Sequence, residues 1–554
     1  MIRKSIKILF CCVFVMTMPE ISAQNKHEIR AVWVTTNWGL DWPTSPANNQ
    51  QNIRNQQKEL LDILDSIQSL NMNTVLFQVR LRGDVIYPSA YEPWNYIMSG
   101  KSGRSPGYDP LAFAIEACHE RGLECHAWIV CIPLGSDSQV RAHGKNSVVA
   151  KHKSICKKLN GEWYLDPGHP QTEKYLSTIV KEIVYNYPID GIHLDYIRYP
   201  DRPARFPDSD TFRKYARKGE TRDEWRERNI TRIVYRIYDE VKKIKPEVAV
   251  SSSPLGKHND LPHFPSQGWS GMESVYQNAI QWMEDGKQDF IAPMLYFKEQ
   301  AFFPFLFDWI KKKKDCRIVC GIGLYRMQAD KGDWSLSDIT RQIAIGRELG
   351  TDGQSFFRLR NLLDNTKQVT DQLYTDFYVH PALLPPLNQD SSKVSSPVIE
   401  QISLSADSAI IVWNSVPGAK GYVVYGSNRY PVDTNDGDNI QYIGFNDTMF
   451  ISRKPCTAYA VSAFDAFRRE SKPTQWNETE VGLSLIVNKN DRKLRLNERE
   501  DHYNEMILYK EGFIEVYRGK YSTETLLPKL PEGSYILALK PETGKEKRYI
   551  LTIE

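Results

Sequence analysis

Short apolar runs alternate with charged, amphipathic stretches through the first two thirds of this 554-residue chain, and this alternation constrains its fold more than any other feature. The runs are rich in Val, Ile, Leu and Phe, which is typical of parallel strands buried on both faces. The stretches between them, such as 56–69 with Leu60, Leu64 and Ile67 on one stripe, predict helices. Eight repeats predict an α/β fold, a (β/α)8 TIM barrel over residues 28–385. The eight runs are 29–35, 74–80, 124–130, 191–197, 248–254, 290–297, 317–325 and 354–359.

The pattern changes after the last of these runs. A Pro-rich and Ser/Asp/Asn-rich patch over 381–397 predicts a linker, and alternation at period two follows at 409–413, 421–425 and 458–464. These segments predict an all-β sandwich over 396–480. A last block, 481–554, contains further strand-like segments and predicts a small C-terminal β domain. We therefore expect a barrel followed by C-terminal all-β sandwich domains.

Three aromatic residues narrow the expectation for the sandwich. Trp413, Tyr422 and Tyr459 stand on its predicted strands. Their positions resemble those of the strand B Trp, the strand C Tyr and the corner Tyr of a fibronectin type III domain.

The N-terminus has the pattern of a secretory signal. Basic Arg3, Lys4 and Lys7 precede an apolar run at 8–16, and a small-residue site ends at Ala23. The apolar run is too short to span a bilayer, and no later segment is long and apolar enough to do so. We expect a signal peptide at 1–23, no transmembrane segment after its removal, and an exported protein that is periplasmic, cell-surface or secreted.

Composition excludes several classes of function. A formal charge of +3 gives no electrostatic footprint for nucleic acid. The His residues are scattered rather than spaced as metal ligands, and neither a Gly-rich phosphate loop nor a Gly-x-Ser-x-Gly elbow occurs, so no metal or other cofactor is expected. The chain has 13 Trp and 29 Tyr, which suits a partner that stacks against flat rings.

The segment 190–200 carries the strongest candidate for chemistry. Asp195 ends a predicted strand, Arg198 follows three residues later, and a barrel presents its catalytic groups at the C-terminal ends of strands. We interpret Asp195 as a catalytic nucleophile or as the carboxylate that stabilises an oxocarbenium-like centre. The alternative is a structural ion pair with Arg198.

Other strand ends and loops supply acids, arginines and aromatic rings. Paired carboxylates with aromatic platforms match glycoside hydrolysis, in which one acid protonates the leaving oxygen. Glu299, Asp166 and Asp84 are the candidates for that second acid, although Asp166 before Pro167 and Asp84 after Gly83 could instead shape turns. Trp33 and Trp128 lie within predicted strands and are expected in the core. The predicted substrate-binding residues are Gln78, Arg80, Asp84, Trp94, His126, Arg198, Tyr296 and Trp38, with His126 equally interpretable as a core histidine.

Several motifs in order resemble one known family, the glycosyl-hydrolase-like family 10 of exported bacterial barrels. The resemblance covers about residues 28–365 and implies a barrel fold and hydrolysis of a glycan. Some members resemble peptidoglycan glycan-strand hydrolases. The matching motifs lie at 28–36, 41–43, 77–80, 83–84, 91–94, 108–111, 126–128, 165–168 and 190–200.

The chain departs from this pattern in two places. In many members the corresponding motif looks like Asp-Asp-Tyr, whereas residues 194–196 of this chain are Leu-Asp-Tyr. The chain therefore keeps only one of the two carboxylates. After the motif at 126–128, members of the family often show an Asn-Pro-Tyr-Arg-like stretch, whereas residues 129–133 of this chain are Ile-Val-Cys-Ile-Pro. Two hypotheses follow: an exported glycoside hydrolase acting on a polysaccharide such as the glycan strands of peptidoglycan, or a non-catalytic glycan-binding surface protein on a degenerate barrel.

Overall fold

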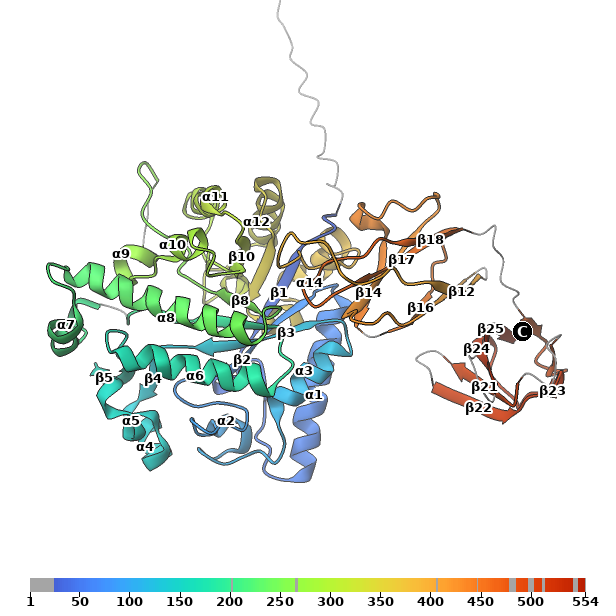
Figure 1. The fold of residues 1–554 in the computed structure, drawn as a ribbon, viewed down its shortest axis with the longest axis horizontal. Helices are drawn as coiled ribbons and strands as arrows, with labels where there is room; N and C mark the ends of the chain where they lie inside the picture. The colour runs from blue at the N-terminus through green and yellow to red at the C-terminus, as the bar shows by residue number, and fades with distance from the viewer. Residues whose placement is uncertain are drawn as a thin grey trace, which may run out of the picture.

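The computed structural model describes most of the chain from Gln24 onward (Figure 1). The predicted signal peptide, 1–23, lies outside the described residues. The described ranges are 24–200, 203–264, 268–404, 407–445, 447–477, 485–496, 503–510, 514–541 and 547–553.

Eight parallel strands close into a barrel in the order β1-β11-β10-β9-β8-β7-β3-β2. Each begins within one residue of the start of a predicted apolar run, so the (β/α)8 fold is confirmed. The strands are β1 (Ile29–Val34), β2 (Thr74–Arg80), β3 (Glu124–Val130), β7 (Gly191–Asp195), β8 (Ala249–Ser252), β9 (Phe290–Ile291), β10 (Arg317–Gly323) and β11 (Gly353–Phe357).

Helices pack their apolar stripes on the outer face of this barrel. In α1 the stripe of Leu60, Ile63, Leu64 and Ile67 is buried. Capping residues set where several helices begin, as in α8, where Thr221 and Glu224 form a capping box. The main helices are α1 (Gln50–Ser69), α3 (Pro110–His119), α6 (Pro170–Asn186), α8 (Arg222–Ile244), α10 (Ala279–Glu284), α11 (Phe303–Lys312) and α12 (Leu336–Leu349).

An insertion follows β3 and forms a small sheet of its own. Its strands β4 (Pro133–Ser136), β5 (Cys156–Leu159) and β6 (Glu162–Leu165) are antiparallel in the order β4-β6-β5. The short helices α4 (Asp137–His143) and α5 (Val148–Lys151) lie between β4 and β5. Because the insertion leaves the C-terminal end of β3, it stands at the end of the barrel where catalytic groups gather.

The barrel is followed by a sandwich of two antiparallel sheets, ordered β12-β13-β16 and β15-β14-β17-β18. Trp413, Tyr422, Tyr459 and Trp476 are buried in its core. Its strands are β12 (Ile399–Leu404), β13 (Ala409–Trp413), β14 (Gly421–Ser427), β15 (Ile440–Phe445), β16 (Met449–Ser452), β17 (Ala458–Phe464) and β18 (Thr474–Asn477).

A second β unit follows the sandwich and lies beyond it from the barrel (Figure 1). It has a five-stranded sheet, β19-β25-β24-β21-β22, and a two-stranded sheet, β20-β23. Ile536 of this unit joins a buried cluster with Ile410, Val412 and Met449 of the sandwich. Its strands are β19 (Leu485–Val487), β20 (Lys493–Arg495), β21 (Glu505–Lys510), β22 (Ile514–Lys520), β23 (Glu524–Leu526), β24 (Gly533–Lys540) and β25 (Lys547–Ile553).

Charged contacts join the sandwich to the N-terminal end of the barrel. Lys420 Nζ lies 2.9 Å from Glu124 Oε1, at the start of β3, and 2.8 Å from Asp190 Oδ1, just before β7. Arg468 also pairs with Glu124. Although burial of Glu124 acts in the opposite direction, Arg468 and Lys420 hold the pKa of its carboxyl well below the usual range. The sandwich therefore covers the end of the barrel opposite the C-terminal strand ends.

Within the part of the chain that the structure describes, no helix combines the length and apolar character that crossing a bilayer requires.

Candidate active site

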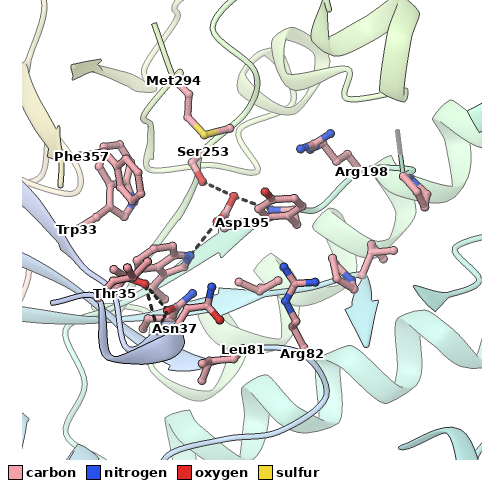
Figure 2. A pocket seen from close by; sticks show the side chains of 18 of the residues that line it. Trp33, Thr35, Asn37, Leu81, Arg82, Asp195, Arg198, Ser253, Met294 and Phe357 are labelled. Carbon is pink, nitrogen blue, oxygen red and sulfur yellow. Dashed lines mark hydrogen bonds between the residues drawn. The ribbon is translucent and has the colours of Figure 1, made fainter. Parts of the chain in front are cut away.

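A cavity of about 420 Å³ opens at the C-terminal ends of the barrel strands (Figure 2). Residues at or just after the ends of several strands line it, among them Thr35 after β1, Gln78 on β2, Asp195 on β7 and Ser253 after β8. The inserted sheet adds Pro133 and Tyr164 to the wall. Because a parallel barrel brings these strand ends to one rim, distant parts of the sequence share one cavity.

Asp195 lies in this cavity with three hydrogen-bond donors around its carboxylate (Figure 2). Its Oδ1 accepts from the Tyr196 backbone N–H at 2.7 Å and from Ser253 Oγ at 3.1 Å, and its Oδ2 accepts from Trp128 Nε1 at 3.0 Å. The side chain is only 5% exposed. A carboxylate held by fixed donors keeps its orientation while a substrate enters and leaves.

Two opposing effects act on the acidity of Asp195. Burial raises its pKa above the usual value of an aspartate. The Tyr196 N–H, the charge of Arg198 and the hydrogen bonds from Trp128 and Ser253 oppose that rise because they favour the charged form.

Gln78 organises the loop that follows β1. Its Oε1 accepts from the backbone N–H groups of Thr36 and Asn37, both at 3.0 Å, and from Thr35 Oγ1 at 2.8 Å. A flipped amide would place its NH2 group against two N–H donors, so the orientation is determined. Gln78 lines the cavity, as a substrate-binding residue must.

Arginines and aromatic rings both contribute to the wall, and Arg198 lies over the ring of Tyr196 at 4.6 Å. In Figure 2, Trp33 and Phe357 lie on one side of Asp195, and Arg82 and Arg198 lie on the other. Phe357 stacks on Tyr296 with ring centroids 5.9 Å apart. The structure therefore brings the predicted residues Arg198 and Tyr296 together with Asp195 and Gln78.

Trp38 stands beside the mouth of the cavity rather than among its lining residues. Its side chain is 59% exposed, and the guanidinium of Arg82 lies 5.9 Å from its ring centroid. An exposed ring next to a cavity wall residue is available to a longer ligand.

Trp33 and Trp128 lie in the buried core, as predicted, and both also line the cavity, which the sequence analysis did not predict. Each indole is largely buried, but Trp128 donates to Asp195 and Trp33 packs edge-on against Phe357 at 6.3 Å. The available signal was their register: both lie near the C-terminal ends of their strands, where inward-facing residues meet the cavity.

Besides Trp38, four predicted substrate-binding residues are absent from the lining, namely Arg80, Asp84, Trp94 and His126. Arg80 is fully buried, forms an ion pair with Glu92 at 2.7 Å and donates to the Cys131 carbonyl at 2.9 Å. Asp84 accepts from Asn95 at 2.8 Å and contacts His143 Nε2 at 3.0 Å. Both residues therefore have structural roles, because their contacts hold the loop that follows β2 in place. Half-buried Trp94 belongs to the same loop, where its segment bridges to Val85.

His126 is a core histidine, one of the two interpretations that the sequence left open. It is fully buried, and its Nε2 lies 3.0 Å from Glu124 Oε2 near the opposite end of the barrel. Gly191 on β7 makes room for it, because a Cβ there would lie 2.2 Å from His126 Nδ1.

None of the candidates for the second acid, Glu299, Asp166 and Asp84, is among the residues that line the cavity. Glu299 has a 52% exposed side chain and pairs with Arg341 at 2.7 Å. Asp166 is buried and accepts from the Gly168 N–H and Thr211 Oγ1, both at 2.9 Å, as a turn-forming residue does. Burial raises its pKa to about 6. Among the described residues that line the cavity, Asp195 is the one acid.

Comparison with known proteins finds glycosyl hydrolases among the relatives of this chain. A family model described as "Glycosyl hydrolase-like 10" matches residues 28–331. The glycosyl hydrolase YngK of Bacillus subtilis (strain 168) is 31% identical over 391 residues, which span 67% of this chain and 76% of that protein. The glycosyl hydrolase DigH of Escherichia coli (strain K12) is 32% identical over 333 residues, 56% of this chain and 76% of that protein.

Among solved structures, the glycoside hydrolase domain of PgaB (BpsB) from Bordetella bronchiseptica is similar over 63% of this chain and 99% of its own. Its sequence identity is 14% and its TM-score is 0.44.

Proposed function

This chain belongs to the glycosyl hydrolase-like 10 family, which supports a glycosidase-type role, and we propose that it hydrolyses glycosidic bonds with Asp195 as the catalytic carboxylate. The single observation that carries the proposal is the position of Asp195. It lies in a cavity walled by aromatic rings, and three donors orient its carboxylate.

In the proposed reaction, Asp195 acts on the anomeric carbon. As the anion it either attacks that carbon or stabilises the positive charge that develops there. Trp33, Trp128 and Tyr296 line the cavity and give its wall an aromatic character that suits the C–H groups of a sugar ring. Gln78 and Asn37 supply polar groups for hydroxyl or amide recognition. The leaving oxygen also needs a proton, and we assign no residue to that role.

We further propose that the substrate is the glycan strand of peptidoglycan, reached by an exported protein. Two observations support this choice. The sequence of 1–23 has the pattern of a signal peptide. Arg82 and Arg198 both line the cavity, and a guanidinium is well suited to a carboxylate such as the lactyl group of muramic acid.

The decisive experiment is incubation of the purified protein with peptidoglycan glycan strands and, separately, with plant and host polysaccharides, followed by detection of new reducing ends. We expect product from the glycan strands. Asp195→Asn should reduce turnover by at least about a thousandfold, because the neutral amide can neither attack nor stabilise the anomeric centre. Its thermal unfolding midpoint should stay close to that of the native protein. Wild-type turnover in this variant would refute the assignment.

A second candidate function is favoured by one observation: a glycosidase commonly uses two carboxyl groups, and the described part of the cavity wall presents one. On a degenerate barrel the same wall would bind a glycan without cleaving it. Saturable binding with no new reducing ends would support that function.

For the sandwich, we propose a fibronectin type III-like module. The order of its seven strands supports the proposal. So does Tyr459, whose hydroxyl accepts from the Cys456 backbone N–H at 2.7 Å in the manner of a tyrosine corner.

A further inference from the structure

The indole of Trp33 is fixed by a residue that does not line the cavity. Trp33 Nε1 donates to His193 Nε2 at 3.1 Å. His193 is fully buried on β7, one layer below the cavity, and its ring lies beside that of Phe290 at 6.3 Å. Trp33 in turn packs against Phe357, so its ring is constrained at one edge by a hydrogen bond and at another by an aromatic contact.

The donor and acceptor of each hydrogen bond among Trp33, His193 and Ser251 can be assigned. An indole N–H can only donate, so His193 Nε2 must present a lone pair, and Nδ1 carries the proton. Nδ1 then donates to Ser251 Oγ at 2.9 Å, and the Ser251 hydroxyl donates to the Ile192 carbonyl at 3.4 Å. The chain crosses β1, β7 and β8, and it leaves both ring nitrogens of His193 satisfied.

The histidine also stays neutral as the pH changes. Burial, and secondarily the neighbouring His126, lower its pKa to about 3. A protonated ring would place an N–H at Nε2 against the Trp33 N–H, and the contact would be lost.

We propose that His193 is a positioning residue for sugar binding, which fixes the indole of Trp33 in the wall of the cavity that holds Asp195. This inference rests on the proposed function. It deepens that function because it makes a buried histidine, remote from the substrate, a determinant of affinity.

The first test replaces the acceptor. His193→Met keeps the buried volume and removes the nitrogen that receives the indole proton, whereas His193→Gln keeps an acceptor. With glycan-strand tetrasaccharides from amidase-treated peptidoglycan as the probe, His193→Met should raise Kd and KM about tenfold and change kcat less than twofold. His193→Gln should recover most of the affinity.

The second test reads the hydrogen bond directly. In protein labelled with 15N-tryptophan, the indole resonance of Trp33, identified by its loss in Trp33→Phe, should move upfield in His193→Met. In a double-mutant cycle, His193→Met should add no further loss of affinity to Trp33→Phe, because His193 acts through that ring.

His126 supplies the matched control. It is also a fully buried barrel histidine, but it contacts Glu124 and does not contact Trp33 in the described hydrogen bonds. His126→Asn should leave KM and the Trp33 resonance unchanged.

The outcomes separate this inference from the function on which it rests. If the native protein binds the tetrasaccharide and His193→Met binds it equally well, or if the two substitutions in the cycle are additive, the positioning role is wrong and the proposed function stands. If the native protein neither binds nor cleaves any glycan while Asp195→Asn folds normally, the proposed function fails and the positioning role fails with it.

Discussion

At the scale of single residues, one carboxylate depends on donors from three separate strands or their ends. Trp128 is on β3, Asp195 and Tyr196 are at the end of β7, and Ser253 follows β8. Each donor favours the charged form of Asp195, and burial favours the neutral form. Removal of one donor should therefore move the acidity of the carboxyl in a predictable direction.

Ser253→Ala tests that direction. The pKa of Asp195 should rise when a hydrogen bond to its charged form is lost. Since the anion is the active form, the acid limb of the kcat/KM profile against glycan strands should move to higher pH. Ser252→Ala is the control, because the buried Ser252 hydroxyl has no hydrogen-bond partner among the described residues. An unchanged acid limb in Ser253→Ala would show that this bond does not tune Asp195.

His193 should make the protein less stable in mild acid. Its pKa is about 3 in the folded state against an ordinary 6.5, so the unfolded chain binds its proton first as the pH falls. The free energy of unfolding therefore carries no penalty from His193 above about pH 6.5. It loses about 1.4 kcal/mol per pH unit below that, or about 2 kcal/mol by pH 5. Urea unfolding at pH 7.5 and pH 5 should show this loss in the native protein and a smaller one in His193→Gln.

The sequence identified only part of the cavity wall at this scale. Asp195, Arg198, Gln78 and Tyr296 were predicted because strand ends are readable from apolar periodicity. Trp33 and Trp128 were correctly expected in the core, but their contact with the cavity was missed, because inward-facing strand residues look alike in sequence whether they lie in a closed layer or beside a cavity. Arg80 was misassigned, since nothing local reveals its partner Glu92.

At the scale of elements, strand starts were predictable and some strand ends were not. The run 290–297 predicts a long strand, whereas β9 (Phe290–Ile291) is short. Pro293 has no N–H to donate to a ladder, and the chain bends there into the cavity wall through Met294 and Tyr296. The inserted sheet β4-β6-β5 is not predicted from the sequence, because its four-residue strands give too short a pattern to recognise.

The loop after β1 should loosen when its acceptor on β2 is removed. Gln78→Ala leaves the backbone N–H groups of Thr36 and Asn37 without their partner, at about 2 kcal/mol of local stability. Hydrogen exchange of peptides covering 35–40 should accelerate at least about tenfold, and KM should rise. Gln68→Ala, on the exposed side of α1, should change neither. Unchanged exchange in Gln78→Ala would mean that other contacts hold the loop.

At the scale of the whole molecule, barrel and sandwich share buried charges. Glu124 contacts Lys420 and Arg468, which follow it by 296 and 344 residues. No periodicity or local motif encodes a contact at such separations. The sequence therefore predicted both modules and left their junction undetermined.

Lys420→Met should destabilise the protein by about 3 kcal/mol, because it leaves the buried carboxylates of Glu124 and Asp190 short of a cation. The measurement is urea unfolding monitored by tryptophan fluorescence. Lys58→Met is the control: that lysine pairs with Asp62 on an exposed helix face, with side chains 74% and 59% exposed, so its loss should cost at most about 0.5 kcal/mol. Equal effects would mean that the junction contributes no more than a surface pair.

The junction also determines which way the molecule faces. Asp190 meets the sandwich at one pole of the barrel, and five residues later Asp195 meets the cavity at the other. A tether attached through the sandwich would leave the cavity pointing outward. A protein anchored in this way would keep its cavity accessible to a surrounding polymer.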